Sequence, residues 1–294
     1  MKCTFIGGAL LAVLGTAGCE VTVDSQTQVV REEKRFTTAG PPVLRVATFD
    51  GSIQIQSWDK PDIFIEIEKR GPTKESVDSL QVTTDQKGDT IELEVKRPRS
   101  EFHGFGFHRS PSARLIVSVP HRADVRARSG DGSIRIDRVT GRIELHTGDG
   151  SIHATDVSGN LTIHTGDGSV TVDGADGRLD LETGDGGVNV TGRLTSLRAH
   201  TGDGSIVFRG QPGTAMSEDW EITTGDGGVS LYLPPDFDAD LDAHTGDGTI
   251  RNDLDIKAGT DGEISKRTVR GRIGDGGKRM QIRTGDGSIS LRRF

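Results

Sequence analysis

The chain has 294 residues, a formal net charge of −8 and 41 glycines, and only 4% of its residues are aromatic. This composition argues against one wide core filled with large side chains. The acidic balance argues against nucleic acid as a partner, because phosphate binding needs clustered lysine and arginine.

The start of the chain, up to Gly18, has the features of an export signal. Lys2 gives a positive start, residues 5–14 form an apolar run too short to span a bilayer, and small residues precede Cys19. This segment resembles a bacterial lipoprotein signal, although Thr16 stands where such signals usually have leucine. The resemblance implies cleavage after Gly18 and a lipid on Cys19, which would anchor the exported protein to a membrane of the bacterial cell envelope. A secreted protein that is cut elsewhere is the alternative.

Two segments of different character follow. Residues 19–42 are polar and end near a pair of prolines, which predicts a tether that holds the folded part away from the membrane. Residues 43–120 contain runs in which apolar and polar residues alternate, and this period of two predicts half-buried strands. We therefore expect a β-rich N-terminal region.

A glycine-containing loop interrupts this region between residues 96 and 113. It has three phenylalanines and two histidines within residues 102–108. An exposed contact tip with metal-binding histidines is one interpretation. A loop whose phenylalanines cover one edge of the sheet is the other.

The rest of the chain is organised by the repeated sequence Thr-Gly-Asp-Gly. A variant that begins at Ser129 opens the series. The first five aspartates recur with a fixed period of about 18 residues, and a fixed period of this kind is typical of repeat architectures. The repeated aspartates are Asp131, Asp149, Asp167, Asp185, Asp203, Asp226, Asp247 and Asp286.

Apolar residues recur at fixed distances from each aspartate. They stand six and four residues before it and three and five residues after it; around Asp149 they are Ile143, Leu145, Ile152 and Ala154. Each unit therefore has two short strands that cannot bury their own apolar faces. Stacking of successive units would bury them.

These observations predict an all-β fold. Residues 121–294 would form a β-solenoid, a two-sheet parallel β-helix with about 18 residues per coil, after a degenerate β-rich region at residues 43–120. Eight coils at about 4.8 Å each would give an array roughly 38 Å long. The wider spacing between Asp247 and Asp286 predicts an insertion at residues 253–271. An antiparallel meander with Thr-Gly-Asp-Gly in hairpin turns is the alternative, although it would leave one apolar face uncovered.

The sequence resembles the putative-adhesin family of bacterial envelope proteins, which are β-repeat proteins of unknown function. The resemblance is carried by Leu115-Ile-Val-Ser-Val-Pro, by Asp124-Val-Arg-Ala-Arg and by the small-Gly-Asp-Gly-Ser-Ile units that follow, and it covers residues 43–294. It implies an envelope location and a role in adhesion. It brings no catalytic residues with it.

Stacked coils would place the eight aspartates in a ladder. Unit charges about 5 Å apart repel by roughly 0.8 kcal/mol at the dielectric constant of water, so the ladder needs compensation. In one interpretation, each aspartate accepts hydrogen bonds from turn amides. A row of Ca²⁺ sites is the alternative, but here the apolar residue comes three places after the aspartate, whereas the calcium-binding repeat has it two places after. We predict no resident metal or other cofactor, with Ca²⁺ as the alternative.

A second ladder stands three residues before the aspartates, on side chains that would point outward. Four of its members are histidines, His146, His164, His200 and His244. A soft metal ion shared by His146 and His164 is one interpretation. A solvated face that offsets the aspartate charge is the other, and protonation of its histidines near pH 6 would then stabilise the protein.

Together these features favour a non-enzymatic, lipid-anchored envelope protein that presents a rigid repeat surface for adhesion, or for binding a surface polysaccharide or an envelope protein. Three alternatives stay open: a calcium-binding repeat protein, a β-helix carbohydrate-active enzyme with carboxylates on one face, and an envelope sensor or assembly scaffold. The enzyme is disfavoured because Trp58, Trp220 and Tyr232 are the only tryptophans and tyrosine for sugar stacking, and Trp220 takes an inward position.

Overall fold

The computed structural model describes residues 19–24, 27–97, 110–258 and 262–293. Within them the protein is all-β, with 25 strands and a single helix of five residues. The export signal at residues 1–18 and the phenylalanine and histidine loop at residues 102–108 lie outside the described residues.

The helix is α1 (Lys74–Asp78), and Thr73 caps its N-terminus. The strands are β1 (Cys19–Asp24), β2 (Thr27–Phe36), β3 (Val43–Thr48), β4 (Ile53–Trp58), β5 (Ile63–Gly71), β6 (Gln81–Lys87), β7 (Thr90–Lys96), β8 (Ser112–Pro120), β9 (Asp124–Ser129), β10 (Ile134–Asp137), β11 (Thr140–Thr147), β12 (Ile152–Thr155), β13 (Ser158–Thr165), β14 (Val170–Thr183), β15 (Val188–Thr201), β16 (Ile206–Gly210), β17 (Trp220–Thr224), β18 (Val229–Leu233), β19 (Ala239–Thr245), β20 (Ile250–Asn252), β21 (Ile256–Lys257), β22 (Glu263–Ile264), β23 (Thr268–Ile273), β24 (Arg279–Thr284) and β25 (Ile289–Arg293).

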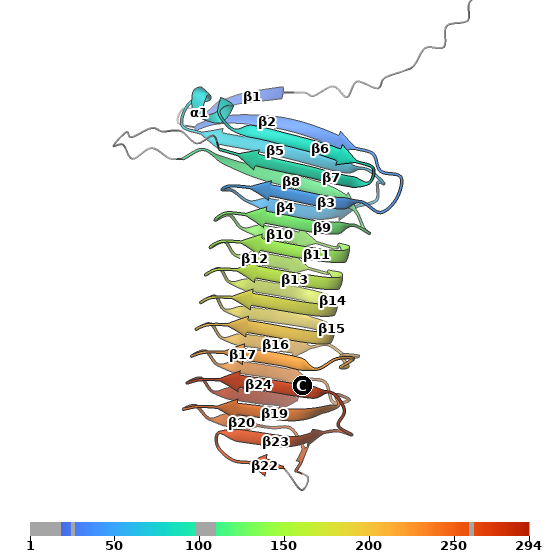
Figure 1. Cartoon of the computed structure of the whole chain (residues 1–294), viewed down its shortest axis with the longest axis vertical. Coiled ribbons are helices and arrows are strands. Elements are labelled where there is room, and N and C mark those ends of the chain that lie inside the picture. The colour runs from blue at the N-terminus through green and yellow to red at the C-terminus, as the bar shows by residue number, and fades with distance from the viewer. Residues whose placement is uncertain (1–18, 25–26, 98–109, 259–261, 294) are drawn as a thin grey trace, which may run out of the picture.

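The repeats form a stack of coils that are joined by parallel pairing (Figure 1). On the side that follows each turn, Ile134 of β10 pairs with Ile152 of β12, its equivalent in the next repeat. On the side that precedes each turn, Leu145 of β11 pairs with Ile163 of β13. The antiparallel meander is therefore wrong for these strands, because a hairpin turn would pair the two strands of one unit in opposite directions.

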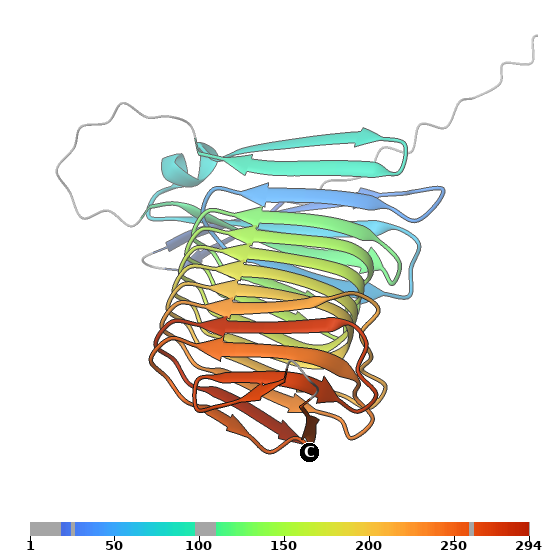
Figure 2. The same ribbon diagram turned by 60° about the horizontal axis from the view of Figure 1, so that its bottom comes forward.

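The core is a thin layer between the two sides of the stack (Figure 2). All the apolar residues that the sequence places at the four inward positions are buried. Full burial of one such side chain stabilises the fold by about 1.5–3 kcal/mol. Because one continuous cluster runs through the coils, each coil depends on its neighbours for burial.

The N-terminal end combines parallel and antiparallel strands. β3 and β4 form a coil that pairs in parallel with β9 and β10, whereas β2, β5 and β8 pair antiparallel. Residues 27–36, which the sequence assigns to the tether, form β2 and pair with β5 along its length. Ion pairs hold this strand, including one of 3.0 Å between Arg31 and Glu68 and one of 2.5 Å between Glu32 and Lys69. Because charged residues hold this strand, its sequence lacks the alternation of apolar and polar residues from which a strand is predicted.

The C-terminal end departs from the order of the chain. β24 lies between β17 and β19, and β25 lies between β18 and β20, so the last coil in sequence fills a slot inside the stack (Figure 1). The insertion expected at residues 253–271 contributes β21, β22 and the start of β23, and β23 pairs antiparallel with β19. The turn of Asp286 therefore stands between those of Asp226 and Asp247, which corrects the expected sequential order.

The last coil should carry as much stability as a regular one. Ile282 of β24 is fully buried between Ile222 and Ala243, so Ile282→Ala should lower the free energy of unfolding by about 2–5 kcal/mol. The control variant Gln281→Ala, which changes the neighbouring outward residue, should change the free energy of unfolding by less than about 0.5 kcal/mol. Denaturant unfolding compares the two, and equal losses would contradict the placement of β24 inside the stack.

Candidate functional site

The repeated turn is held by the threonine that begins Thr-Gly-Asp-Gly. Thr165 is 1% exposed, and its hydroxyl donates to the carbonyls of Gly148 and Gly150 on the neighbouring coil at 3.2 and 3.0 Å. The amide of Gly166 donates to the same Gly148 carbonyl at 2.5 Å. Equivalent hydroxyl contacts are made by Thr147, Thr183, Thr201, Thr224, Thr245 and Thr284.

The eight turn aspartates lie at the surface. All of them are exposed, and within the described residues none accepts a hydrogen bond from a turn amide. This corrects the interpretation that aspartate satisfies the turn, because the buried threonine does so. Its sequence signal is the continuing alternation: threonine stands two residues before aspartate, after the inward positions at six and four.

The described residues contain no group of three or more histidine, cysteine, aspartate or glutamate side chains arranged to hold a metal ion. The aspartates in the turns project separately into solvent, and only Asp247 has a cation nearby in the described part of the chain, with Arg267 at 3.6 Å. Each turn could therefore offer a calcium ion only one carboxylate, whereas calcium sites in proteins use six to eight oxygens.

The histidine row is brought together only in part. His146 and His164 are partners on adjacent strands, with ring centroids 5.9 Å apart. Nδ1 of His164 also lies 3.3 Å from the carboxylate of Glu182 on the next strand. His200 stands opposite Glu182, and His244 contacts the hydroxyl of Thr268 at 3.0 Å, so these two histidines are separate from the first pair.

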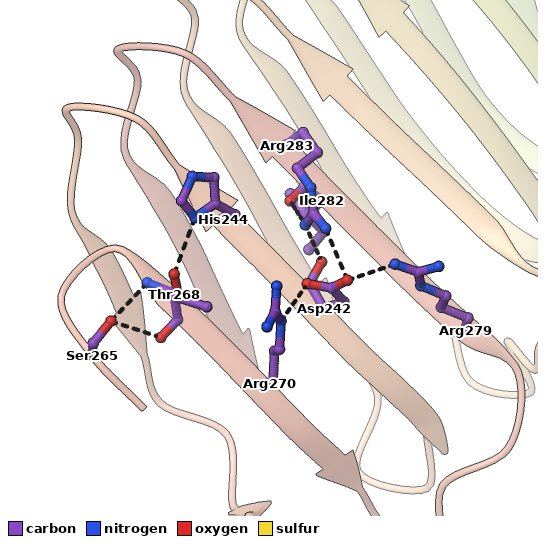
Figure 3. Close-up of polar contacts among 8 residues, drawn as sticks. All are labelled: Asp242, His244, Ser265, Thr268, Arg270, Arg279, Ile282 and Arg283. Atoms are coloured by element: carbon purple, nitrogen blue, oxygen red, sulfur yellow. Dashed lines mark hydrogen bonds and ion pairs between the residues drawn. The ribbon is translucent and has the colours of Figure 1, made fainter. Parts of the chain in front are cut away.

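A cluster that the sequence does not predict surrounds Asp242 (Figure 3). Its carboxylate accepts hydrogen bonds from the guanidiniums of three arginines: Arg270 of β23 at 3.2 Å, Arg279 of β24 at 2.6 Å and Arg283 of β24 at 2.8 Å. The Asp242 side chain is only 15% exposed. The cluster joins the inserted β24 and the antiparallel β23 to β19 between them, so one carboxylate links the three strands that close this end of the stack.

A family model described as Toastrack DUF4097 matches residues 43–292. The chain belongs to the Toastrack DUF4097 family. A comparison with curated proteins gives no match.

Several solved structures resemble this Toastrack chain at low identity. A putative adhesin of Bacteroides fragilis is 12% identical, with a TM-score of 0.48 over 90% of this chain and 97% of the other. A putative cell adhesion protein of Clostridium sporogenes is 13% identical, with a TM-score of 0.31 over 90% and 99%. A putative lipid binding protein of Parabacteroides distasonis is 12% identical, with a TM-score of 0.40 over 90% and 96%. The family membership rests on the sequence match alone.

The described part of this Toastrack chain contains no helix that is long and apolar enough to cross a bilayer.

The pKa of His146 is lower than the ordinary value for histidine. Partial burial disfavours its charged form, and the charges of Arg128, His164 and Arg126 act in the same direction, while Glu144 opposes them. The expected stabilisation by acid is therefore reversed at this residue. A folded-state pKa below the unfolded one gives stability that is present above about pH 6.5 and is lost as the pH falls.

A His146→Gln variant tests this direction. Between pH 7.5 and 5.5, the free energy of unfolding of the unmodified Toastrack chain should fall relative to that of the variant, because only the histidine must take up a proton at a site that disfavours charge. Denaturant unfolding at a series of pH values measures the difference. A relative gain of the unmodified chain on acidification would contradict the prediction.

Asp242 should have a pH dependence of the same sign in a more acidic range. Burial alone would raise its pKa, but the guanidiniums of Arg283, Arg279 and Arg270 outweigh burial and hold the pKa well below its usual range. Its contribution is present above the unfolded pKa, near about 3.9, and is lost as the pH falls below that value.

At pH 7, Asp242→Asn should lower the free energy of unfolding by about 1.5–3 kcal/mol, because three guanidiniums lose a charged acceptor that is itself largely buried. The deficit should shrink below about pH 4, where the unmodified carboxylate begins to lose its advantage. The exposed neighbour Asp240→Asn, as a control, should change stability by less than about 0.5 kcal/mol. A deficit of the same size at pH 7 and pH 3 would show that the charge is not the cause.

Proposed function

We propose that the protein is a non-enzymatic component of the bacterial cell envelope that presents a repeated surface for adhesion, by binding a surface polysaccharide or an envelope protein. In this proposal the repeats act as a rigid rod, a two-sheet parallel β-helix with one repeat in each coil. A lipid on Cys19 anchors the rod after removal of residues 1–18.

The observation that supports this function best is the register of the outward side chains. We call the outward surface of the strands before each turn the pre-turn face; it consists of β9, β11, β13, the second halves of β14 and β15, β17, β24 and β19. On it, Arg126 pairs with Glu144 and Arg198 with Glu221 across neighbouring coils. Polar groups therefore recur at the strand spacing of about 4.8 Å along the stack. A surface with this repeat suits an extended polymer or a protein edge better than a compact substrate.

The position of Cys19 is consistent with an anchor at one end of the rod. It begins β1, which pairs with β2 at the N-terminal end, whereas the last coils lie at the far end of the stack (Figure 1). A lipid there would turn the C-terminal coils away from the membrane. The exposed aspartates, which are alike from turn to turn, support a binding role because an active site needs one distinct constellation.

Expression of the full chain in a bacterial host tests the anchor. The chain should enter the membrane fraction and incorporate labelled palmitate, while Cys19→Ser should lose both properties, because the acylated thiol is then missing. Equal membrane association and labelling of the two forms would contradict the proposed anchor.

Binding to isolated cell envelopes tests the function itself. Purified Cys19→Ser protein should be retained by the envelopes in a saturable way, and pretreatment of the envelopes that removes polysaccharide or surface protein should identify the class of partner. Absence of retention on both intact and treated envelopes would overturn the proposal.

A further inference from the structure

One coil of the regular series is longer than the others. The chain segment between Asp203 and Asp226 is longer than the segments between the preceding turn aspartates, which are all equal. The additional residues form a loop at residues 211–219 between β16 and β17. The loop is tied to β15, because the Thr214 hydroxyl donates to the Gly192 carbonyl at 3.2 Å and the Ser217 amide donates to the Thr195 carbonyl at 2.9 Å.

A hollow of about 400 Å³ lies on the pre-turn face beside this loop. A short side chain lines it: seven residues before the turn aspartate, three coils have Arg142, Arg178 and Arg279, whereas the coil that precedes the long loop has Ser196. Ser196 is the strand partner of Arg178 and is 8% exposed. Glu218 of the loop makes two hydrogen bonds to the Arg178 guanidinium and closes one wall.

The other walls come from four strands. Asp180 of β14 stands opposite Arg198 of β15, and Arg198 lies 3.5 Å from Glu221 of β17. Gln281 of β24 is the strand partner of Glu221. The hollow therefore runs across the coils, along the axis of the stack. Its last wall comes from β24, the strand that lies between β17 and β19. We call it the axial groove, after its direction.

The lining of the axial groove suits a ligand with many hydroxyl groups. Its volume lies in the usual range for small-molecule sites, but its walls are polar where most such sites are apolar. Guanidiniums only donate hydrogen bonds and carboxylates only accept them, while a hydroxyl does both. Asp180 and Arg198, on adjacent strands, can thus bind neighbouring hydroxyls of one ring. Gln281 lies two strands beyond Arg198, so it can bind a hydroxyl of a following ring of the same chain.

The charges of the groove disfavour an acidic ligand. Four carboxylates line it, those of Asp180, Glu218, Asp219 and Glu221, against three guanidiniums, and the whole chain has a net charge of −8. All three arginines also have carboxylate partners, because Arg178 pairs with Glu218, Arg198 with Glu221 and Arg279 with Asp242. A uronate or a sulfated sugar would meet uncompensated negative charge.

We propose that the axial groove binds a neutral saccharide unit of a polysaccharide chain, an inference that rests on the proposed binding function and names its ligand. A polysaccharide lying along the stack axis would pass over the groove and contact the pre-turn face of the neighbouring coils on either side.

A glycan array tests the ligand class. The probes are immobilised neutral glucans, mannans and galactans, together with uronate-containing and sulfated glycans, and the protein is the unacylated Cys19→Ser chain. Retention on at least one neutral series is expected. Retention only on the acidic glycans, or on none, would overturn the proposal.

Two variants locate the site. Ser196→Arg would place in the hollow the long side chain that three other coils have at this position, and should reduce glycan retention at least tenfold. Gln281→Ala removes a wall group without touching the core, and should reduce retention severalfold. Arg135→Ala, an exposed arginine on β10 at the opposite face, is the matched control and should leave retention unchanged. Thermal unfolding of every variant checks that the stack is intact.

Envelope binding separates this inference from the function on which it rests. Retention on envelopes that neither Ser196→Arg nor Gln281→Ala reduces would overturn the groove as the site and leave the envelope function standing. Loss of glycan and envelope retention together in the folded variants would support both. If the protein with an unmodified groove is retained neither on any glycan nor on envelopes, both the groove as a glycan site and the envelope function are overturned.

Discussion

The stack depends on the close contact between the Thr-Gly-Asp-Gly turns of neighbouring coils. A methyl group at Gly186 would lie 2.0 Å from the carbonyl oxygen of Gly168, so only glycine allows the backbones to approach this closely. The same approach brings the buried threonine hydroxyl within reach of two carbonyls on the next coil. Glycine and threonine therefore fix the register, and register in turn sets which side chains face the core and which face solvent.

Because the turn and inward residues hold the stack together, a uniform stack can have a varied surface. The turn and the inward aliphatic residues hold each coil in place, so the outward positions are free to differ in charge, size and polarity. His146, Glu182 and Arg283 occupy equivalent places on the pre-turn face, and each meets a different environment. The proposed binding function uses this freedom: the axial groove lies where one coil has a short side chain, Ser196, and the next coil has a longer loop.

The sequence predicts what repeats within one unit, and it does not predict what distinguishes one unit from another. Period and alternation correctly assign the buried positions, and equal spacing correctly pairs His146 with His164. The place of β24 is missed because its apolar residues fit any slot in the stack equally well. β2 is missed because ion pairs hold it, and the Asp242 cluster and the axial groove are missed because their residues are distant in the chain and meet only across coils. The lowered pKa of His146 is not predicted from the sequence, since the burial of its ring and its position beside Arg128 are visible only in three dimensions.

The free energies of unfolding of Gly186→Ala and Gly187→Ala, measured side by side, test the turn contact most directly. These adjacent residues differ in surroundings: a methyl group at Gly186 would overlap Gly168 and lie 2.8 Å from the Thr183 hydroxyl, whereas at Gly187 the nearest atom would be 4.0 Å away. We predict that Gly186→Ala lowers the free energy of unfolding by more than about 2 kcal/mol, and that Gly187→Ala changes it by no more than about 1 kcal/mol in either direction. Equal effects of the two substitutions would show that the coils do not depend on the turn contact.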